Sequence, residues 1–142
     1  MAKFSTVGLE DLERDFAAVA EMPDSVILEM LTAEAEVIAE AQAAEARAML
    51  SGPYSTGTTA GGVTFDRKLT KTADGKAVYV AIKGTRSDGN RRRVAEVAFV
   101  NEFGKKRQPA RPFIRVANER AADGAVEAAA RVYDGFLKSK NL

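Results

Sequence analysis

Cysteine, histidine and tryptophan are all absent from this sequence of 142 residues. Without cysteine there can be no disulfide, no thiolate metal site and no cysteine nucleophile. Without histidine, the common zinc ligand sets, the serine–histidine triads and the most frequent general base are missing too. A carboxylate or lysine mechanism stays open, but the composition favours a protein that is not an enzyme and predicts no metal, no cofactor and no catalytic residues.

A long apolar run is also missing. The first residues, MAKFSTVGLEDLERD, contain no apolar stretch of the kind found in signal peptides, and acidic residues begin at Glu10. We therefore expect no signal peptide and no membrane-spanning helix. The protein is expected to be made and used in a cytoplasm, or in a particle assembled there. The chain has the length of a single domain, covering residues 1–142.

Basic residues are scarce in the first third and concentrated later. Residues 1–50 carry 3 basic and 11 acidic residues, residues 86–115 carry 9 basic and 3 acidic, and the whole chain has a net charge of +1. Such a distribution predicts that copies of the chain attract one another head to tail. The alternative, given equal weight, is two solvated faces that never meet.

Two helices are predicted before residue 51. Residues 8–20 have apolar side chains at helical spacing, and Pro23 ends this short helix. Asp24 and Ser25 can cap a second helix that runs to about Leu50. Its apolar stripe comprises Ile27, Met30, Leu31, Val37, Ile38, Ala41, Ala48 and Met49. The opposite face is acidic, with Glu29, Glu36, Glu40 and Glu45. Because this helix is long for a small domain, part of it is expected to project or to pack on a neighbour.

The middle of the chain predicts two loops around a small antiparallel sheet. Residues 51–62 hold four glycines, one proline and no charge, which is typical of a mobile loop. Strands are expected over Val63–Thr70 and Ala77–Lys83, with a turn at Ala73–Gly75. Residues 84–93 are predicted to form a second mobile loop, strongly basic.

Residues 94–103 fit either a strand or a short helix, and we prefer the helix because Gly104 stands where a helix C′ glycine belongs. Pro112 is expected at the first position of a final helix. The predicted buried stripe of that helix is Phe113, Val116, Ala117, Ala121, Ala125, Ala128, Val132 and Phe136. The fold class is thus α+β: a long N-terminal helix, a small antiparallel sheet and a C-terminal helix packed on the sheet.

Three groups of residues invite a chemical interpretation. GPYSTGTT imitates a phosphate loop but lacks its lysine and follows a helix, so a flexible loop is the better hypothesis. Glu96 and Glu102 are a possible acid–base pair, but Glu102 stands near a predicted helix C-terminus and is more plausibly paired with Arg111 or Arg115.

The arginines and lysines between residues 86 and 111 form the third group. They are Arg86, Arg91, Arg92, Arg93, Lys105, Lys106, Arg107 and Arg111. No stacking aromatics are interleaved with the loop arginines, so non-specific contact with DNA passing through a channel fits better than sequence recognition. A partner-facing protein surface is the other interpretation, and we expect the partner interface here.

The segment AFVNEFGKKRQPARPFIRVANE resembles the C-terminal signature of the tail-component family of long-tailed bacteriophages. The matching positions are Glu102, Phe103, Gly104, Pro112 and Phe113. The segment GPYSTG also resembles the family's loop after the long helix, through Pro53, Thr56 and Gly57. One departure follows Gly57, where TTAGG precedes the first strand. The order of helix, loop, sheet and final helix covers nearly the whole chain.

This resemblance implies a structural virion protein of the phage neck, which completes the tail and joins it to the head. Copies are expected to form a homo-oligomeric ring, sixfold to match a tail tube. The implied partners are other neck and tail proteins, such as head-closure and tail-terminator proteins, with possible non-specific contact with DNA in the channel and no membrane. The implied location is the virion neck, assembled in the host cytoplasm. The alternative is a small basic nucleic-acid-binding module.

Overall fold

A computed structural model describes residues 13–14, 17, 20–53, 55–86 and 92–141. Most of the helix predicted over residues 8–20 lies outside these residues. In the described part the elements follow the order helix, small sheet, helix, which confirms the predicted α+β class. In that same part, no helix is both long and apolar enough to cross a bilayer.

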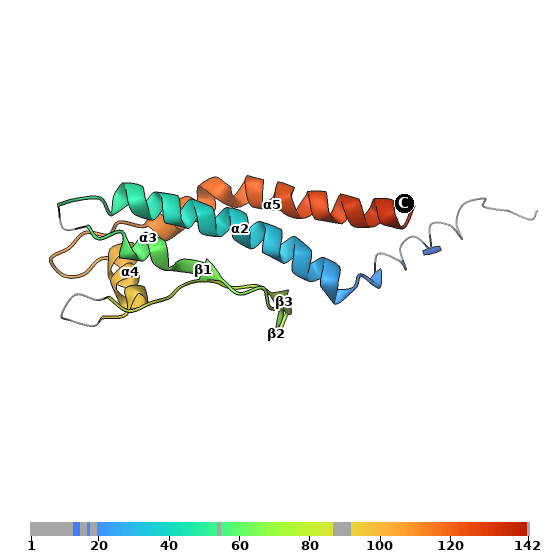
Figure 1. The fold of residues 1–142 in the computed structure, drawn as a ribbon, viewed down its shortest axis with the longest axis horizontal. Helices are drawn as coiled ribbons and strands as arrows, with labels where there is room; N and C mark the ends of the chain where they lie inside the picture. Colours follow the sequence, from blue (N-terminus) through green and yellow to red (C-terminus); the bar gives the residue numbers. More distant parts are fainter. Residues whose placement is uncertain (1–12, 15–16, 18–19, 54, 87–91, 142) are drawn as a thin grey trace, which may run out of the picture.

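Two long helices form the body of the molecule. α2 (Asp24–Met49) and α5 (Phe113–Ser139) lie side by side and extend along the long axis (Figure 1). Their lengths are nearly equal, 26 and 27 residues. α5 therefore covers α2, part of which was expected to project or to pack on a neighbouring molecule.

Apart from a phenylalanine near each end of α5, the buried side chains of these two helices are small or polar. The buried residues of α2 are Thr32, Ala35, Gln42 and Ala46, and those of α5 are Phe113, Ala117, Ala125, Ala129 and Phe136. The stripe predicted for α5 is confirmed in outline. The stripe predicted for α2 is wrong in detail: its larger side chains are only half-buried, and Ala48 is exposed. Alanine-rich faces allow two helices to approach closely, which displaces the larger side chains to the flanks.

The position of α5 differs from the prediction that it packs on the sheet. α5 packs mainly on α2, and α2 in turn contacts β1 (Val63–Phe65). The reason is the area available for contact. Each strand has only three residues, whereas α2 offers α5 a packing surface of nearly its own length.

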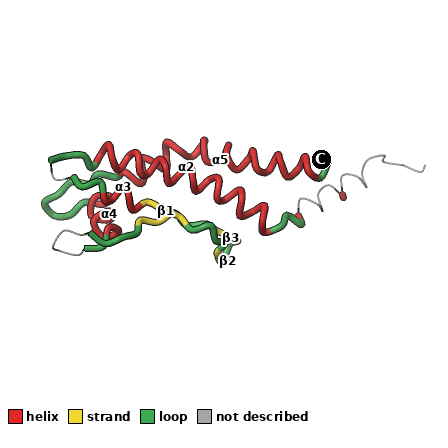
Figure 2. The backbone as a smooth tube through the Cα atoms, viewed as in Figure 1, coloured by secondary structure: helices red, strands yellow, loops and turns green. Residues whose placement is uncertain are grey.

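The strands form a hairpin with two separate ladders (Figure 2). β1 pairs antiparallel with β4 (Val80–Ile82), and β2 (Thr70–Thr72) pairs antiparallel with β3 (Gly75–Ala77). Thr72 lies opposite Gly75, so the turn falls where the sequence predicted it. At the tip, Lys76 forms an ion pair with Asp24 at the start of α2.

Two segments between the long helices are also helical. α3 (Thr58–Gly62) occupies the second half of the predicted loop 51–62, which corrects that prediction for these residues. Gly62, at the end of α3, allows the backbone at Lys83 to approach closely, because a Cβ at position 62 would lie 2.5 Å from the carbonyl oxygen of Lys83. α4 (Val94–Phe103) confirms the preferred helix over residues 94–103.

The largest buried side chain joins these elements. Phe113 has no exposed surface and belongs to a cluster with Ala46 of α2, Ala60 of α3 and Ala98 of α4. Since the four residues come from four helices, the start of α5 depends on their joint packing.

Replacing Phe113 with alanine is therefore expected to destabilise the fold by about 3–5 kcal/mol, because it leaves a cavity at this junction. Phe103→Ala is the matched control, since Phe103 is 68% exposed and its truncation should change stability by no more than about 0.5 kcal/mol. Denaturant unfolding measures both changes. Equal midpoints for Phe113→Ala and the unsubstituted protein would contradict the burial of Phe113.

Candidate functional site

α4 and α5 are joined by a compact connector, residues 104–112, here called the elbow. Gly104 has a φ of 76°, and a Cβ there would lie 2.8 Å from the amide nitrogen of Ala110 and from the carbonyl oxygen of Gln108. Lys105 and Gln108 exchange two backbone hydrogen bonds of 2.9 Å. Gly104 is thus required by both conformation and space, and Lys106 and Arg107 are exposed at the tip of a tight turn.

Asn101 holds the elbow against α4. Its Oδ1 accepts hydrogen bonds from Gln108 Nε2 at 3.1 Å and from Arg111 Nη2 at 2.8 Å. The side-chain Nδ2 of Asn101 donates a hydrogen bond to the carbonyl oxygen of Val97 at 3.0 Å. The backbone carbonyl of Asn101 accepts a hydrogen bond from the backbone N–H of Arg111 at 2.6 Å. No motif in the sequence singled out Asn101. The only signal was a polar residue within an apolar helical segment, immediately before Glu-Phe-Gly.

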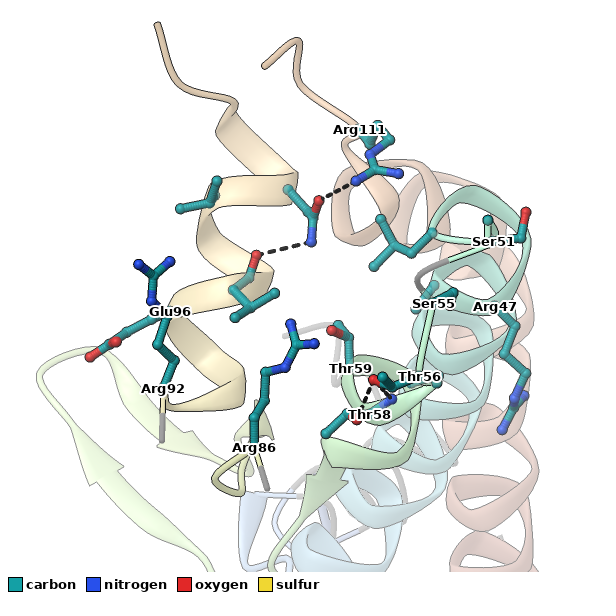
Figure 3. A pocket seen from close by; sticks show the side chains of 18 of the residues that line it. Arg47, Ser51, Ser55, Thr56, Thr58, Thr59, Arg86, Arg92, Glu96 and Arg111 are labelled. Atoms are coloured by element: carbon teal, nitrogen blue, oxygen red, sulfur yellow. Dashed lines mark hydrogen bonds between the residues drawn. The ribbon is translucent and has the colours of Figure 1, made fainter. Parts of the chain in front are cut away.

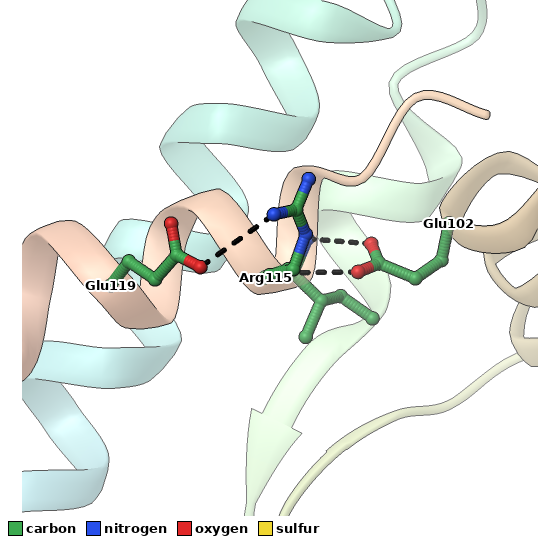
Figure 4. Close-up of polar contacts among 4 residues, drawn as sticks. Glu102, Arg115 and Glu119 are labelled. Carbon is green, nitrogen blue, oxygen red and sulfur yellow. Dashed lines mark hydrogen bonds and ion pairs between the residues drawn. The ribbon is translucent and has the colours of Figure 1, made fainter.

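Glu102 links α4 to the first turn of α5 (Figure 4). Its two carboxylate oxygens accept hydrogen bonds from the backbone N–H groups of Ile114, at 2.8 Å, and Arg115, at 3.0 Å. The predicted ion pair with an arginine side chain is therefore wrong. The Arg111 side chain is bonded to Asn101, and that of Arg115 lies 3.7 Å from Glu119. An anion at a helix N-terminus satisfies free N–H groups and the helix dipole together, without ordering a long side chain.

The other residues of the motif have structural places as well. Pro112 precedes the first residue of α5 as its N-cap, one position earlier than predicted, and Phe113 is the buried anchor. Phe103 is exposed, so it does not contribute to the core.

A polar cleft lies between the segment 51–60 and the α4–elbow side of the molecule (Figure 3). We call it the arginine cleft; its volume is about 720 Å³. The two motif segments, which are distant in sequence, meet here: Pro53, Thr56 and Gly57 line one side, and Asn101 and the elbow line the other.

Most of the charged residues that line the arginine cleft are cations. The charged residues of the lining are Arg47, Arg86, Arg92, Lys105, Arg111 and Glu96, of which Arg47 and Glu96 direct their charged ends away from the cleft (Figure 3). Serine and threonine residues of the segment 51–59 line the cleft too, and Thr59 lies towards Arg86 across it (Figure 3). Clustered guanidinium groups and hydroxyls can bind an oxyanion, such as a phosphate or a carboxylate. Acid–base chemistry is not supported, because Glu102, the proposed partner of Glu96, is committed to capping α5.

The structure divides the residues that were predicted to form the partner interface. Arg86, Arg92, Lys105 and Arg111 line the arginine cleft. Lys106 and Arg107 are exposed on the elbow, and Arg93, at the start of α4, lies 3.7 Å from Glu96. Arg91 lies outside the described residues.

The segment that imitates a phosphate loop has another local structure. Thr56 Oγ1 lies 2.6 Å from Thr58 Oγ1, and Gly57 adopts a φ of 70° before α3 begins. α3 has five residues, too few for the strand–loop–helix cradle of a nucleotide site. In the described ranges, no group of three or more acidic, histidine or cysteine side chains could hold a metal ion.

Comparisons with known proteins identify no relative. No protein-family model matches the sequence, and neither the curated proteins nor the solved structures contain a match. The resemblance to the tail-component family therefore stays a prediction.

Replacing Glu102 with alanine is expected to destabilise the fold by roughly 0.5–2 kcal/mol, because two N–H groups at the start of α5 lose their acceptors. Glu119→Ala is the control, since Glu119 makes an exposed pair with Arg115 within α5 and should matter little. Hydrogen exchange provides a local measurement. The amides of Ile114 and Arg115 should lose protection in Glu102→Ala, and unchanged protection would disprove the cap.

Proposed function

We propose that this protein is a structural component of a bacteriophage neck, which completes the tail and joins it to the head as part of a hexameric ring. The observation that carries this proposal is the use of the motif residues. Glu102 caps α5, Gly104 permits the turn and Phe113 anchors the core, so the motif builds a junction rather than a catalytic centre.

The charge distribution supports assembly between copies. The elbow presents exposed Lys106 and Arg107, whereas α2 is acidic. Three acidic residues of α2 form ion pairs within the chain: Asp24 with Lys76, Glu36 with Arg67 and Glu45 with Arg120. Among the described residues, no cation pairs with Glu29, Glu34 or Glu40. α2 thus retains negative charge that a neighbouring copy, or another neck protein such as a head-closure or tail-terminator protein, can neutralise.

Phage particles provide the test. Particles made without this protein should accumulate heads and tails that fail to join, as seen by electron microscopy. A Lys106→Glu/Arg107→Glu variant should fold normally but restore joining poorly, because both side chains are exposed on the elbow. Lys68→Glu, an exposed charge reversal beyond β1, is the control and should restore joining. Normal joining in particles that lack the protein would refute the proposal.

The arginine cleft favours a second candidate, a small nucleic-acid-binding module. Its cations could neutralise several phosphates of a DNA backbone. The logarithm of the binding constant should then fall linearly with the logarithm of the salt concentration, with a slope of about −0.9 per neutralised phosphate. The isolated protein should then bind DNA, and Arg92→Gln with Lys105→Gln should reduce both affinity and slope. Lys71→Gln, on the distant hairpin, is the control. Absence of DNA binding, or an affinity for DNA that does not depend on salt concentration, would contradict this second candidate.

A further inference from the structure

An exposed aromatic pair lies on α4. The rings of Phe99 and Phe103 are 63% and 68% exposed, and their centroids are 4.8 Å apart at an interplanar angle of 49°. They are separated by one helical turn, so they form one continuous apolar projection. Large aromatics that share an exposed patch are typical anchors of protein–protein contacts.

A groove lies at the opposite end of the molecule, between the start of α2 and the end of α5. It has a volume of about 380 Å³, and its lining residues are Val26, Glu29, Arg131, Val132, Gly135, Phe136 and Ser139. Figure 1 shows that the two helices separate towards this end, while α4 lies at the other. Gly135 leaves the groove open, because a Cβ there would meet no atom within 4 Å.

The charges beside the aromatic pair are opposite in sign to the charge on the α2 side of the groove. Lys105 and Lys106 follow Phe103 in the chain after Gly104. On the α2 side of the groove, Glu29 is exposed, and in the described part no cation pairs with it. On the α5 side, Arg131 lies 3.9 Å from Glu127, which partly neutralises it.

We propose that the Phe99–Phe103 pair of one copy docks into the Val26–Val132–Phe136 groove of a second copy. Since the two features lie at opposite ends, the same chain cannot bring them together. Residues 10–21 carry five acidic residues and one basic residue, so they are a poorer occupant, because they would place like charges beside Glu29. The contact joins different surfaces, so successive copies form either a closed ring or a filament. The docking proposal rests on the proposed function in one respect: this contact would build the ring of the phage neck.

Two variants separate the two sides of the contact. Phe99→Ala/Phe103→Ala removes the projection, and Gly135→Leu fills the groove. Sedimentation should show oligomers for the unsubstituted protein and monomers for each variant alone. An equal mixture of the two variants should form a heterodimer and nothing larger, because it contains one intact projection and one intact groove per pair.

The controls address folding. Gly135→Ala should leave assembly intact and the helix more stable, since alanine is the better helix former and remains small. If Gly135→Leu fails to fold, Glu29→Lys serves as the groove variant, because its side chain is exposed. An unsubstituted protein that stays monomeric at all concentrations, either variant assembling normally, or a mixture without heterodimers would each overturn the docking proposal.

The outcomes for docking and for neck function remain distinct. Heads and tails that join without the protein refute the neck function, whatever sedimentation shows. Conversely, a ring in the particle that tolerates both variants refutes this contact and leaves the neck function standing.

Discussion

The contact between the Glu102 carboxylate and the first turn of α5 is the constraint on which the rest of the structure depends. It joins the end of one helix to the start of another through two hydrogen bonds that backbone N–H groups donate to the carboxylate. Glu102 is 9% exposed, so losing these bonds would leave a nearly buried charge and two free N–H groups together. Because the partner groups belong to the backbone, the contact determines where α5 begins relative to α4.

That geometry places Phe113 in the core and keeps the elbow short. Gly104 and Asn101 then direct the chain back along α4, with the backbone carbonyl of Asn101 bound to Arg111. Because the buried hydrogen bonds are satisfied within the elbow, Lys106 and Arg107 face outwards without structural partners among the described residues. The elbow therefore combines a rigid backbone with free charge, a suitable combination for a contact between subunits.

The paired helices α2 and α5 give the molecule two different ends. Their small-residue contact holds them together along most of their length, and the groove opens where they separate. α3 and α4 cover the other end, where the arginine cleft and the aromatic pair lie. A body with unlike ends suits repeated head-to-tail contacts, in agreement with the proposed assembly into a ring.

Local sequence patterns determined the helices α2, α4 and α5, the hairpin turn and the buried anchor Phe113, because periodicity, β-branched strands and turn residues act over a few positions. Tertiary structure alone decided that α5 packs on α2, that Glu102 binds backbone rather than arginine, and that α3 replaces part of a loop. It also decided that Pro53, Thr56 and the elbow line one cleft. These outcomes depend on which surfaces fit once distant elements meet, and spacing along the chain does not encode that fit.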